Sequence, residues 1–183
     1  MSVSTNEKSI RTGTPCPPFT LKNVDGRMVS SVELLKDGIL AVIFSCNHCP
    51  YVQGWEGRMV QIQKDYGPRG LRIACINAND DLNYPEDSFA GMVKRHREKG
   101  FNFLYLRDDT QGTAKAFGAT HTPECFVFGR DGRLAYHGRI DENYKDPAGA
   151  KSHDLRNALD AIMAGKAPAV PETYSIGCTI KWK

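Results

Sequence analysis

The sequence predicts an α/β fold in which one central mixed β-sheet is flanked by helices, with an N-terminal β-hairpin extension and a C-terminal tail. The continuous apolar runs at 39–45 and 71–77 are typical of strands that are buried on both faces. Between them, apolar side chains recur at spacings of three and four over 52–66, which indicates a helix with one buried face. A right-handed crossover through this helix would place the two strands side by side and parallel.

The segment before the first buried strand is expected to form a hairpin and a short helix. Asp25-Gly26 accepts the positive φ of a tight turn, so the flanking segments 20–23 and 27–30 should pair. Ser31 is expected to cap a short helix. Three parts are expected along the chain, namely a flexible terminus, one domain and a tail packed on it, at residues 1–12, 13–166 and 167–183.

Short strands and helices alternate through the rest of the domain. Ser88 can cap a helix that ends at Gly100, and Asp131-Gly132 predicts a second hairpin. The remaining expected elements are helices at 89–99, 110–117 and 154–164, and strands at 101–106, 126–128 and 134–138.

Composition limits the classes of function. A net charge of +3 over 183 residues is too small to indicate a nucleic-acid or membrane partner. There is no signal-peptide pattern and no apolar run of about 18 residues, so a cytoplasmic location is expected. In that compartment six cysteines are not expected to form a structural disulfide framework, and a close pair is catalytic or binds metal.

Such a pair stands at the junction between the first buried strand and the long helix. Cys46 and Cys49 are separated by two residues, an arrangement that indicates a redox pair when it follows a strand and opens a helix. The positive end of the helix dipole favours a thiolate there, and His48 between the cysteines would lower a thiol pKa further. Pro50 suits the first helical turn because no N–H donor is needed at that position.

Several stretches resemble one known group of proteins. The chain is similar to the thioredoxin fold, and in particular to the thioredoxin-like or peroxiredoxin-like redoxins grouped with the alkyl hydroperoxide reductase and thiol-specific antioxidant family. The resemblance runs from about Gly13 to the C-terminus, and the matching stretches are 47–51, 76–80, 84–88, 138–141 and 177–183. It implies a cis Pro123 facing the cysteines, with the backbone of Thr122 free to pair with a substrate strand.

Under this resemblance we expect an enzyme of cell redox homeostasis that exchanges thiols and disulfides and has no bound cofactor. Cys46 would be the exposed nucleophile, and Cys49, one helical turn further in, would resolve the mixed disulfide. The partners would be protein or small-molecule thiols and disulfides. His48 before the second cysteine resembles strongly oxidising relatives, so the expected potential is less reducing than the roughly −270 mV of thioredoxin.

The alternative is a peroxiredoxin-like antioxidant peroxidase, in which peroxide oxidises Cys49 to a sulfenic acid that Cys46 or another thiol resolves. Two departures count against it. Cys46 stands where peroxiredoxins carry Thr or Ser, and Pro123 stands in place of their arginine. Loss of a single preorganised donor costs about 3–4 kcal/mol in the transition state. Exchange is therefore preferred.

A third class is zinc or copper binding by Cys46, His48 and Cys49, with His121 or Cys178 as a further ligand. A structural zinc site needs four ligands, and the chain has only one paired cysteine motif. We therefore predict no metal.

Four further candidates have an ordinary structural interpretation that we prefer. The C-terminal tail that contains Cys178 would dock on the domain through Ile176, Ile180 and Trp182, and the Cys178 thiol would not act as a resolving cysteine. Asn79 would fix a turn rather than support the site, while His121 and Glu124 would be surface groups rather than face the pair or relay protons to Cys49. The other cysteines are expected to be structural, at Cys16, Cys75 and Cys125.

Overall fold

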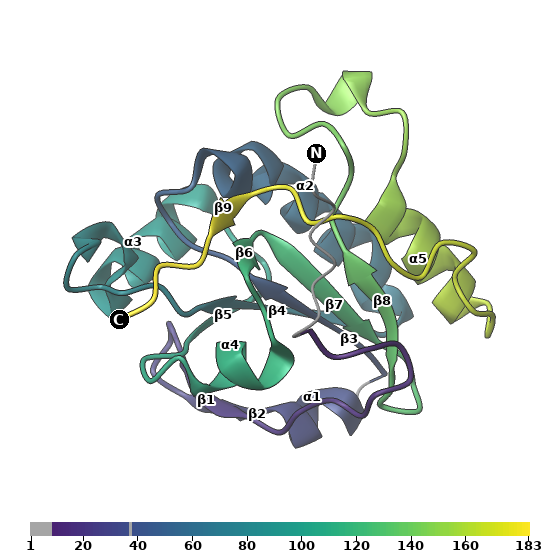
Figure 1. Cartoon of the computed structure of the whole chain (residues 1–183), viewed down its shortest axis with the longest axis horizontal. Helices are drawn as coiled ribbons and strands as arrows, with labels where there is room; N and C mark the ends of the chain where they lie inside the picture. Colours follow the sequence, from purple (N-terminus) through teal and green to yellow (C-terminus); the bar gives the residue numbers. More distant parts are fainter. Residues whose placement is uncertain (1–8, 37) are drawn as a thin grey trace.

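The computed structural model describes residues 9–36 and 38–183, and it has one seven-stranded sheet covered by helices on both faces (Figure 1). The strand order is β2-β1-β5-β4-β3-β7-β8. Its strands are β1 (Thr20–Asn23), β2 (Met28–Ser30), β3 (Ile39–Phe44), β4 (Leu71–Asn77), β5 (Leu104–Arg107), β7 (Glu124–Phe128) and β8 (Leu134–Gly138). The predicted mixed sheet flanked by helices is confirmed.

The helices are α1 (Ser31–Lys36), α2 (Pro50–Tyr66), α3 (Phe89–Lys99), α4 (Gly112–Phe117) and α5 (Asp154–Met163). Single 3-10 turns occur at η1 (Gly67–Arg69), η2 (Pro85–Asp87) and η3 (Pro147–Gly149). A second, two-stranded sheet joins β6 (His121–Thr122) to β9 (Cys178–Thr179). Within the part of the chain that the structure describes, no helix has the length and apolar composition that a bilayer crossing requires.

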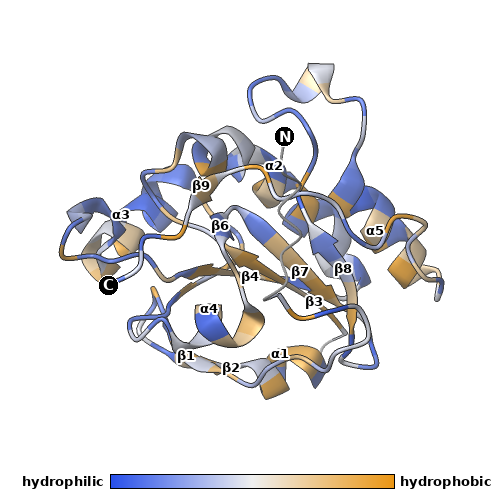
Figure 2. Ribbon diagram, in the orientation of Figure 1, coloured by the Kyte–Doolittle hydropathy of each residue, from blue (hydrophilic) through white to orange (hydrophobic). Residues whose placement is uncertain are grey.

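Strand β3 is the centre of the sheet. It pairs in parallel with β4, as the crossover rule predicts, and antiparallel with β7. All six of its residues are buried, and the apolar colouring of the central strands is visible in Figure 2. The chain that leaves β3 therefore starts from a fixed position between two neighbours.

The two faces of the sheet carry separate apolar clusters. Helices α2, α3 and α5 cover one face, where Trp55, Met59 and Leu159 are fully buried. Helices α1 and α4 cover the other, where Phe117 packs edge-on against Phe126 with ring centroids 5.3 Å apart. Each large side chain buried in this way contributes roughly 1.5–3 kcal/mol. The first of these clusters packs α2 against β3.

Most local predictions hold, with corrections at element ends. The first hairpin pairs as expected and joins the main sheet through β5. The predicted Ser31 cap is wrong, because Ser30 Oγ accepts from the N–H of Val32 and Ser31 Oγ accepts from the N–H of Phe19. Ser88 does cap α3, since its Oγ accepts from the N–H of Gly91. The expected strand at 101–106 begins only at β5.

The termini lie against the domain where they are described. Residues 1–8 of the predicted flexible terminus lie outside the described residues, and the N–H of Ile10 donates to the carbonyl of Phe117. The C-terminal tail crosses the molecule beside β6 before ending near α3 (Figure 1). As expected, Ile180 is buried in the cluster of α4 and Ile176 packs against the other cluster, whereas Trp182 is 43% exposed and contacts the domain only through Lys115 among the cation–π pairs of the described residues.

Candidate active site

The cysteine pair lies where β3 gives way to α2. Helix α2 begins at Pro50, which occupies its first position as predicted. Cys49 is therefore the N-cap residue, with an extended backbone, while Cys46 lies in the loop that precedes the helix. The positive end of the helix dipole consequently acts on Cys49 more directly than on Cys46.

Both sulfurs are shielded from solvent. Cys46 is 1% exposed and Cys49 is 0% exposed, so the expectation of an exposed Cys46 is wrong. Thr122 covers them, because its Oγ1 lies 3.4 Å from Cys46 Sγ and its carbonyl oxygen lies 3.3 Å from Cys49 Sγ. The pair thus lies beneath β6 rather than on an open surface.

The surroundings favour a thiolate at Cys49. Hydrogen bonds from the Cys46 thiol, from Cys178 and from the N–H of Val52 lower the pKa of Cys49 to about 4, although burial opposes them. A protonated Cys49 would donate to the Thr122 carbonyl instead. The pKa of Cys46 is raised, because its thiol donates to Cys49, because it is buried, and because the charge of Asp87 lies nearby. A thiolate was expected at the helix start, and the lowered pKa favours the second cysteine as its position.

Asp87 is the polar centre beneath the loop, and the sequence analysis missed it. Its fully buried carboxylate accepts from the N–H of Asn47 at 2.6 Å and from the side-chain amides of Asn77 and Asn79. The fourth contact is with His48 Nδ1 at 2.5 Å. Asp87 lies within one of the stretches that carried the resemblance, and this was the available signal.

His48 is oriented by this network. Besides its bond to Asp87, its ring stacks on Tyr84 with centroids 5.0 Å apart and planes 10° apart. These contacts hold the ring on Asp87 and Tyr84, and the expected lowering of a thiol pKa by His48 stays a prediction.

One set of side chains could hold a metal ion. The donor atoms of Cys46, His48 and Asp87 all lie within 4.8 Å of one another. A carboxylate offers about four acceptor positions, however, and those of Asp87 already face four donors. A metal would have to displace at least one of these bonds, so the set fits a hydrogen-bonded hub better than a metal site.

The loop with Pro123 faces the sulfurs as expected. The Thr122–Pro123 peptide bond is cis, which confirms the prediction. The backbone of Thr122 is not free, however. Thr122 pairs with Cys178 and His121 pairs with Thr179, both in antiparallel register. The edge expected to receive a substrate strand is therefore occupied by the chain's own tail.

Glu124 and His121 support this loop rather than lying at the surface. The carboxylate of Glu124 is fully buried, so the expected surface position is wrong. It accepts from the N–H groups of Thr120 and His121 and contacts His137 Nε2 at 2.7 Å. His121 is half-buried, and its Nδ1 lies 2.7 Å from Thr120 Oγ1.

Asn79 links the tail to the buried carboxylate. Its N–H donates to Asn77 Oδ1, which is the turn that was predicted. Its side-chain amide donates to Asp87 Oδ2, and its Oδ1 accepts from the N–H of Lys181. Asn79 therefore connects the end of β4, the region beneath the cysteines and the tail.

The cysteines expected to be structural lie apart from these contacts. Cys75 and Cys125 are 1% and 0% exposed, and burial raises the pKa of both. Burial also raises the pKa of the half-buried Cys16 to about 12. Cys178 differs, because it pairs with Thr122, the residue that contacts Cys46 and Cys49.

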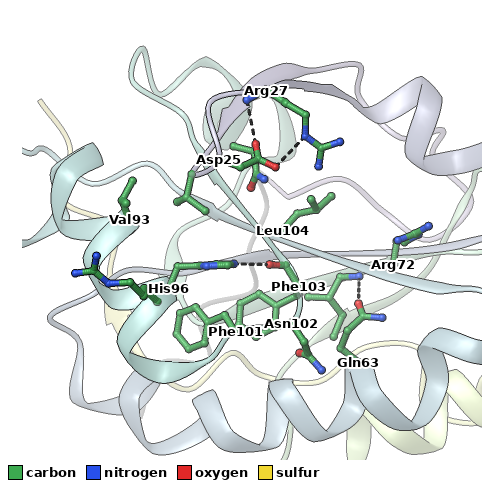
Figure 3. Close-up of a pocket in the computed structure, with 14 residues that line it drawn as sticks. Asp25, Arg27, Gln63, Arg72, Val93, His96, Phe101, Asn102, Phe103 and Leu104 are labelled. Carbon is green, nitrogen blue, oxygen red and sulfur yellow. Dashed lines mark hydrogen bonds and ion pairs between the residues drawn. The ribbon is translucent and has the colours of Figure 1, made fainter.

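A pocket of about 460 Å³ lies elsewhere, between the β1–β2 turn, α3 and β5 (Figure 3). Arg27, His96 and Phe103 are among the residues that line it, and no cysteine is. Its Arg27 is already paired with Asp25 at 2.8 Å. This pocket is separate from the sulfur chemistry.

Comparison with known proteins relates this geometry to one family. The family model described as "AhpC/TSA family" matches residues 12–137, which is more than half of the chain. No curated protein matches the sequence.

Among solved structures, an uncharacterized conserved protein from Geobacillus kaustophilus is 39% identical, with a TM-score of 0.89 over 94% of this chain and 93% of that one. A hypothetical protein from Sinorhizobium meliloti 1021 is 35% identical, with a TM-score of 0.88 over 96% of each chain. A thiol:disulfide interchange protein of the thioredoxin family from Chlorobium tepidum TLS is 24% identical. Its TM-score is 0.59 over 70% of this chain and 87% of that one, which shows the shared thioredoxin fold.

Proposed function

This chain belongs to the AhpC/TSA family of thioredoxin-fold redoxins, and we propose that it acts as a thiol–disulfide oxidoreductase through Cys46 and Cys49. The observation that carries the proposal is the placement of two cysteines where β3 gives way to α2, with Cys49 at the N-cap position and Thr122 of the cis bond in contact with both sulfurs. The hydrogen bond from the thiol of Cys46, three positions earlier in the chain, lowers the pKa of Cys49. A thiolate beside a protonated thiol is the starting state that disulfide exchange requires.

The two cysteines divide the reaction between them. Cys49 thiolate attacks one sulfur of a substrate disulfide, forms a mixed disulfide and releases the other substrate sulfur as a thiolate that takes up a proton. Cys46 then loses its proton and attacks Cys49 Sγ, which forms the Cys46–Cys49 disulfide and releases the second substrate thiolate. Substrate disulfide is thereby reduced and the dithiol is oxidised. These roles reverse those that we expected from the sequence.

Asp87 is suited to assist the second step. Its carboxylate lies within 4.8 Å of Cys46 Sγ and its charge contributes to the raised pKa of that thiol. Once the charge on Cys49 is consumed by bond formation, Cys46 no longer has an anion to donate to. An anionic oxygen near its proton would then favour the proton's departure once one of the four donors to Asp87 gives way to it.

The same charge distribution bears on the redox potential. Hydrogen bonds to the Cys49 thiolate stabilise the reduced protein and are lost when the sulfur enters a disulfide. We therefore expect a potential less reducing than the roughly −270 mV of thioredoxin. The partners in this proposal are thiols and disulfides.

Peroxide reduction at Cys49 is the second candidate, and the position of this thiolate at a helix N-terminus favours it. Oxygen transfer also needs donors that hold the departing hydroxide. The donors at Cys49 are two thiols and backbone N–H groups, while Thr122 Oγ1 contacts Cys46. No guanidinium is among these donors, so exchange remains the better-supported activity.

Reduction of insulin and of glutathione disulfide, measured beside hydrogen-peroxide consumption, separates the two candidates. We expect the wild type to reduce glutathione disulfide, the smaller substrate, and both Cys46→Ser and Cys49→Ser to lose turnover. Cys16→Ser, which lies outside the site, is the matched control. Peroxide turnover that persists in Cys46→Ser, in a protein that reduces neither disulfide, would replace exchange with peroxidase chemistry.

A further inference from the structure

We propose that Cys178 is a third redox thiol of this site, and that the disulfide of the buried pair reaches small external thiols through it. The proposal rests on the proposed function and adds the route by which the pair exchanges with solution. It also names the class of partner, a low-molecular-weight thiol, rather than an added polypeptide strand.

The tail holds Cys178 beside the residue that covers the pair. Strand β9 pairs with β6 in the register Thr122 opposite Cys178 (Figure 1). The carbonyl oxygen of Thr122 lies 3.3 Å from Cys49 Sγ, and Cys178 packs against the apolar cluster that contains Cys46 and Cys49. The preceding residue is a glycine against which Thr122 packs closely, and a Cβ at Gly177 would overlap the carbonyl oxygen of Thr122.

Anchors on the C-terminal side of Cys178 keep this contact in place. The N–H of Ile180 donates to the carbonyl of Thr120 at 2.9 Å, and the side chain of Ile180 is 3% exposed. Lys181 donates its N–H to Asn79 and accepts from the N–H of Asp80 through its carbonyl. The position of Cys178 beside Thr122, next to the buried pair, is therefore part of the fold.

The three thiols differ in solvent exposure, and Cys178 is the most exposed of them. Cys46 and Cys49 are 1% and 0% exposed, whereas Cys178 is half-buried. The β6 edge above the pair is filled by β9, so an incoming polypeptide cannot add there as a strand. The sulfur of this cluster that a reagent in solution meets first is that of Cys178.

The exchange through Cys178 balances without any added oxidant. Cys178 attacks Cys49 Sγ of the Cys46–Cys49 disulfide, which forms a Cys49–Cys178 disulfide, and the released Cys46 thiolate takes the proton that Cys178 gave up. An external thiolate then attacks Cys178 Sγ and expels Cys49 as a thiolate. A second external thiolate attacks the resulting mixed disulfide, which releases Cys178 and the external disulfide. Two external thiols have then supplied the two electrons.

The low pKa of Cys49, about 4, suits the second step, because a thiol of low pKa leaves faster. The pKa of Cys178 is raised to about 11, since it is partly buried and donates to Cys49. Attack on a Cys49–Cys178 disulfide is thereby directed to the sulfur that is both more exposed and the poorer leaving group.

Trapping with glutathione disulfide tests the contact directly. In Cys46→Ser, Cys49 can react with glutathione disulfide but has no partner in the loop. We expect Cys178 to displace glutathione, so that mass spectrometry of the unreduced digest finds a Cys49–Cys178 link in a monomeric protein. In Cys46→Ser/Cys178→Ser, a stable glutathione adduct on Cys49 is expected instead. A persistent adduct in Cys46→Ser, with Cys178 free to react with iodoacetamide, would overturn the proposal.

The rate of reduction of oxidised protein by glutathione tests the route. We expect Cys178→Ser to be reduced more slowly than wild type by about tenfold or more, since glutathione must then reach a fully buried sulfur. Gly177→Ala should slow the reaction too, because it displaces β9 while every thiol remains, and Cys16→Ser should not. Equal rates in all four proteins would contradict the route. If the wild type never forms a Cys46–Cys49 disulfide, the proposed function itself has failed.

Discussion

Two pairs of buried cysteines lie near the end of β3 in the same apolar cluster, and their thiols differ in pKa. Cys75 on β4 and Cys125 on β7 both pair with Ile43 of β3 and are at most 1% exposed. Cys46 and Cys49 leave the end of that strand and are equally buried. Burial raises the pKa of the first two thiols, yet the pKa of Cys49 is lowered.

The difference lies in donors rather than in exposure. Cys75 and Cys125 lie within strands whose backbone N–H groups are used in the sheet. A thiolate there would lose its hydration, and no backbone N–H group would be left to offset that cost. Cys49 stands at the start of a helix, where N–H groups lack partners, and two further thiols donate to it. Burial without hydrogen-bond donors raises the pKa of a cysteine and leaves it unreactive. Burial with such donors stabilises a thiolate that is shielded from solvent.

Replacement of Cys49 should give the largest effect. Cys49→Ser is expected to abolish disulfide reduction, with a loss of roughly a thousandfold or more, because a serine hydroxyl is not ionised at neutral pH. Cys75→Ser, which introduces a hydroxyl into the sheet, is expected to lower the thermal unfolding temperature but to retain the activity of the folded fraction. Steady-state reduction of glutathione disulfide measures the activity of both variants, and a thermal melt measures the unfolding temperature of Cys75→Ser. An active Cys49→Ser protein would remove the distinction between the pairs.

The pH dependence of alkylation should separate the pairs next. Because the pKa of Cys49 is lowered to about 4, its thiolate is present at all pH values above that and is lost only as the pH falls through it. A rate of iodoacetamide modification that is flat from pH 6 to 8 is therefore expected for Cys49, after allowance for its burial by comparison with unfolded protein. An ordinary thiol, with a pKa of about 8.5, would gain reactivity throughout that range. Such a rise at Cys49 would contradict the proposed charge.

The positions of these thiols illustrate what a sequence can foretell. The long apolar run at 39–45 and the helical spacing that follows predict β3 and α2, because local pattern and burial agree there. The cysteine spacing and the cis bond at Pro123 follow from the resemblance. The assignment of the thiolate does not, because the lowered pKa of Cys49 depends on hydrogen bonding that includes the distant Cys178, which no local pattern reveals.

Long-range contacts account for the other misses. Asp87 is separated from Cys46 by 41 positions along the sequence, and its polar neighbours are ordinary loop residues in one dimension. The pairing of β6 with β9 joins two-residue strands far apart in the chain, which leave no periodicity to detect. Glu124 resembles a surface carboxylate until the loop of residues 120–121 folds over it.

Substitution of Asp87 should have a moderate effect on Cys46 and Cys49 and none on Cys75 and Cys125. Asp87→Asn removes a buried charge, so the pKa of Cys46 should fall while the acceptor for its proton is also lost. We expect slower resolution by about tenfold, seen as accumulation of the mixed disulfide between Cys49 and glutathione in quenched samples. Glu86→Gln, at the exposed neighbouring position, is the control. An unchanged resolution rate would exclude Asp87 from the proton's path.

The smallest effect is expected when one donor alone is removed from Cys49. Cys178→Ala deletes the thiol that donates to the anion but keeps the backbone N–H of residue 178, so the pKa of Cys49 should rise by about one unit or less. Titration of the thiolate absorbance near 240 nm, in a variant that lacks Cys16, measures this rise. Cys178→Ser, whose hydroxyl can still donate, should shift the pKa less than Cys178→Ala. If Cys178→Ala instead restores an ordinary cysteine pKa, the tail supplies most of the stabilisation and the helix start supplies little of it.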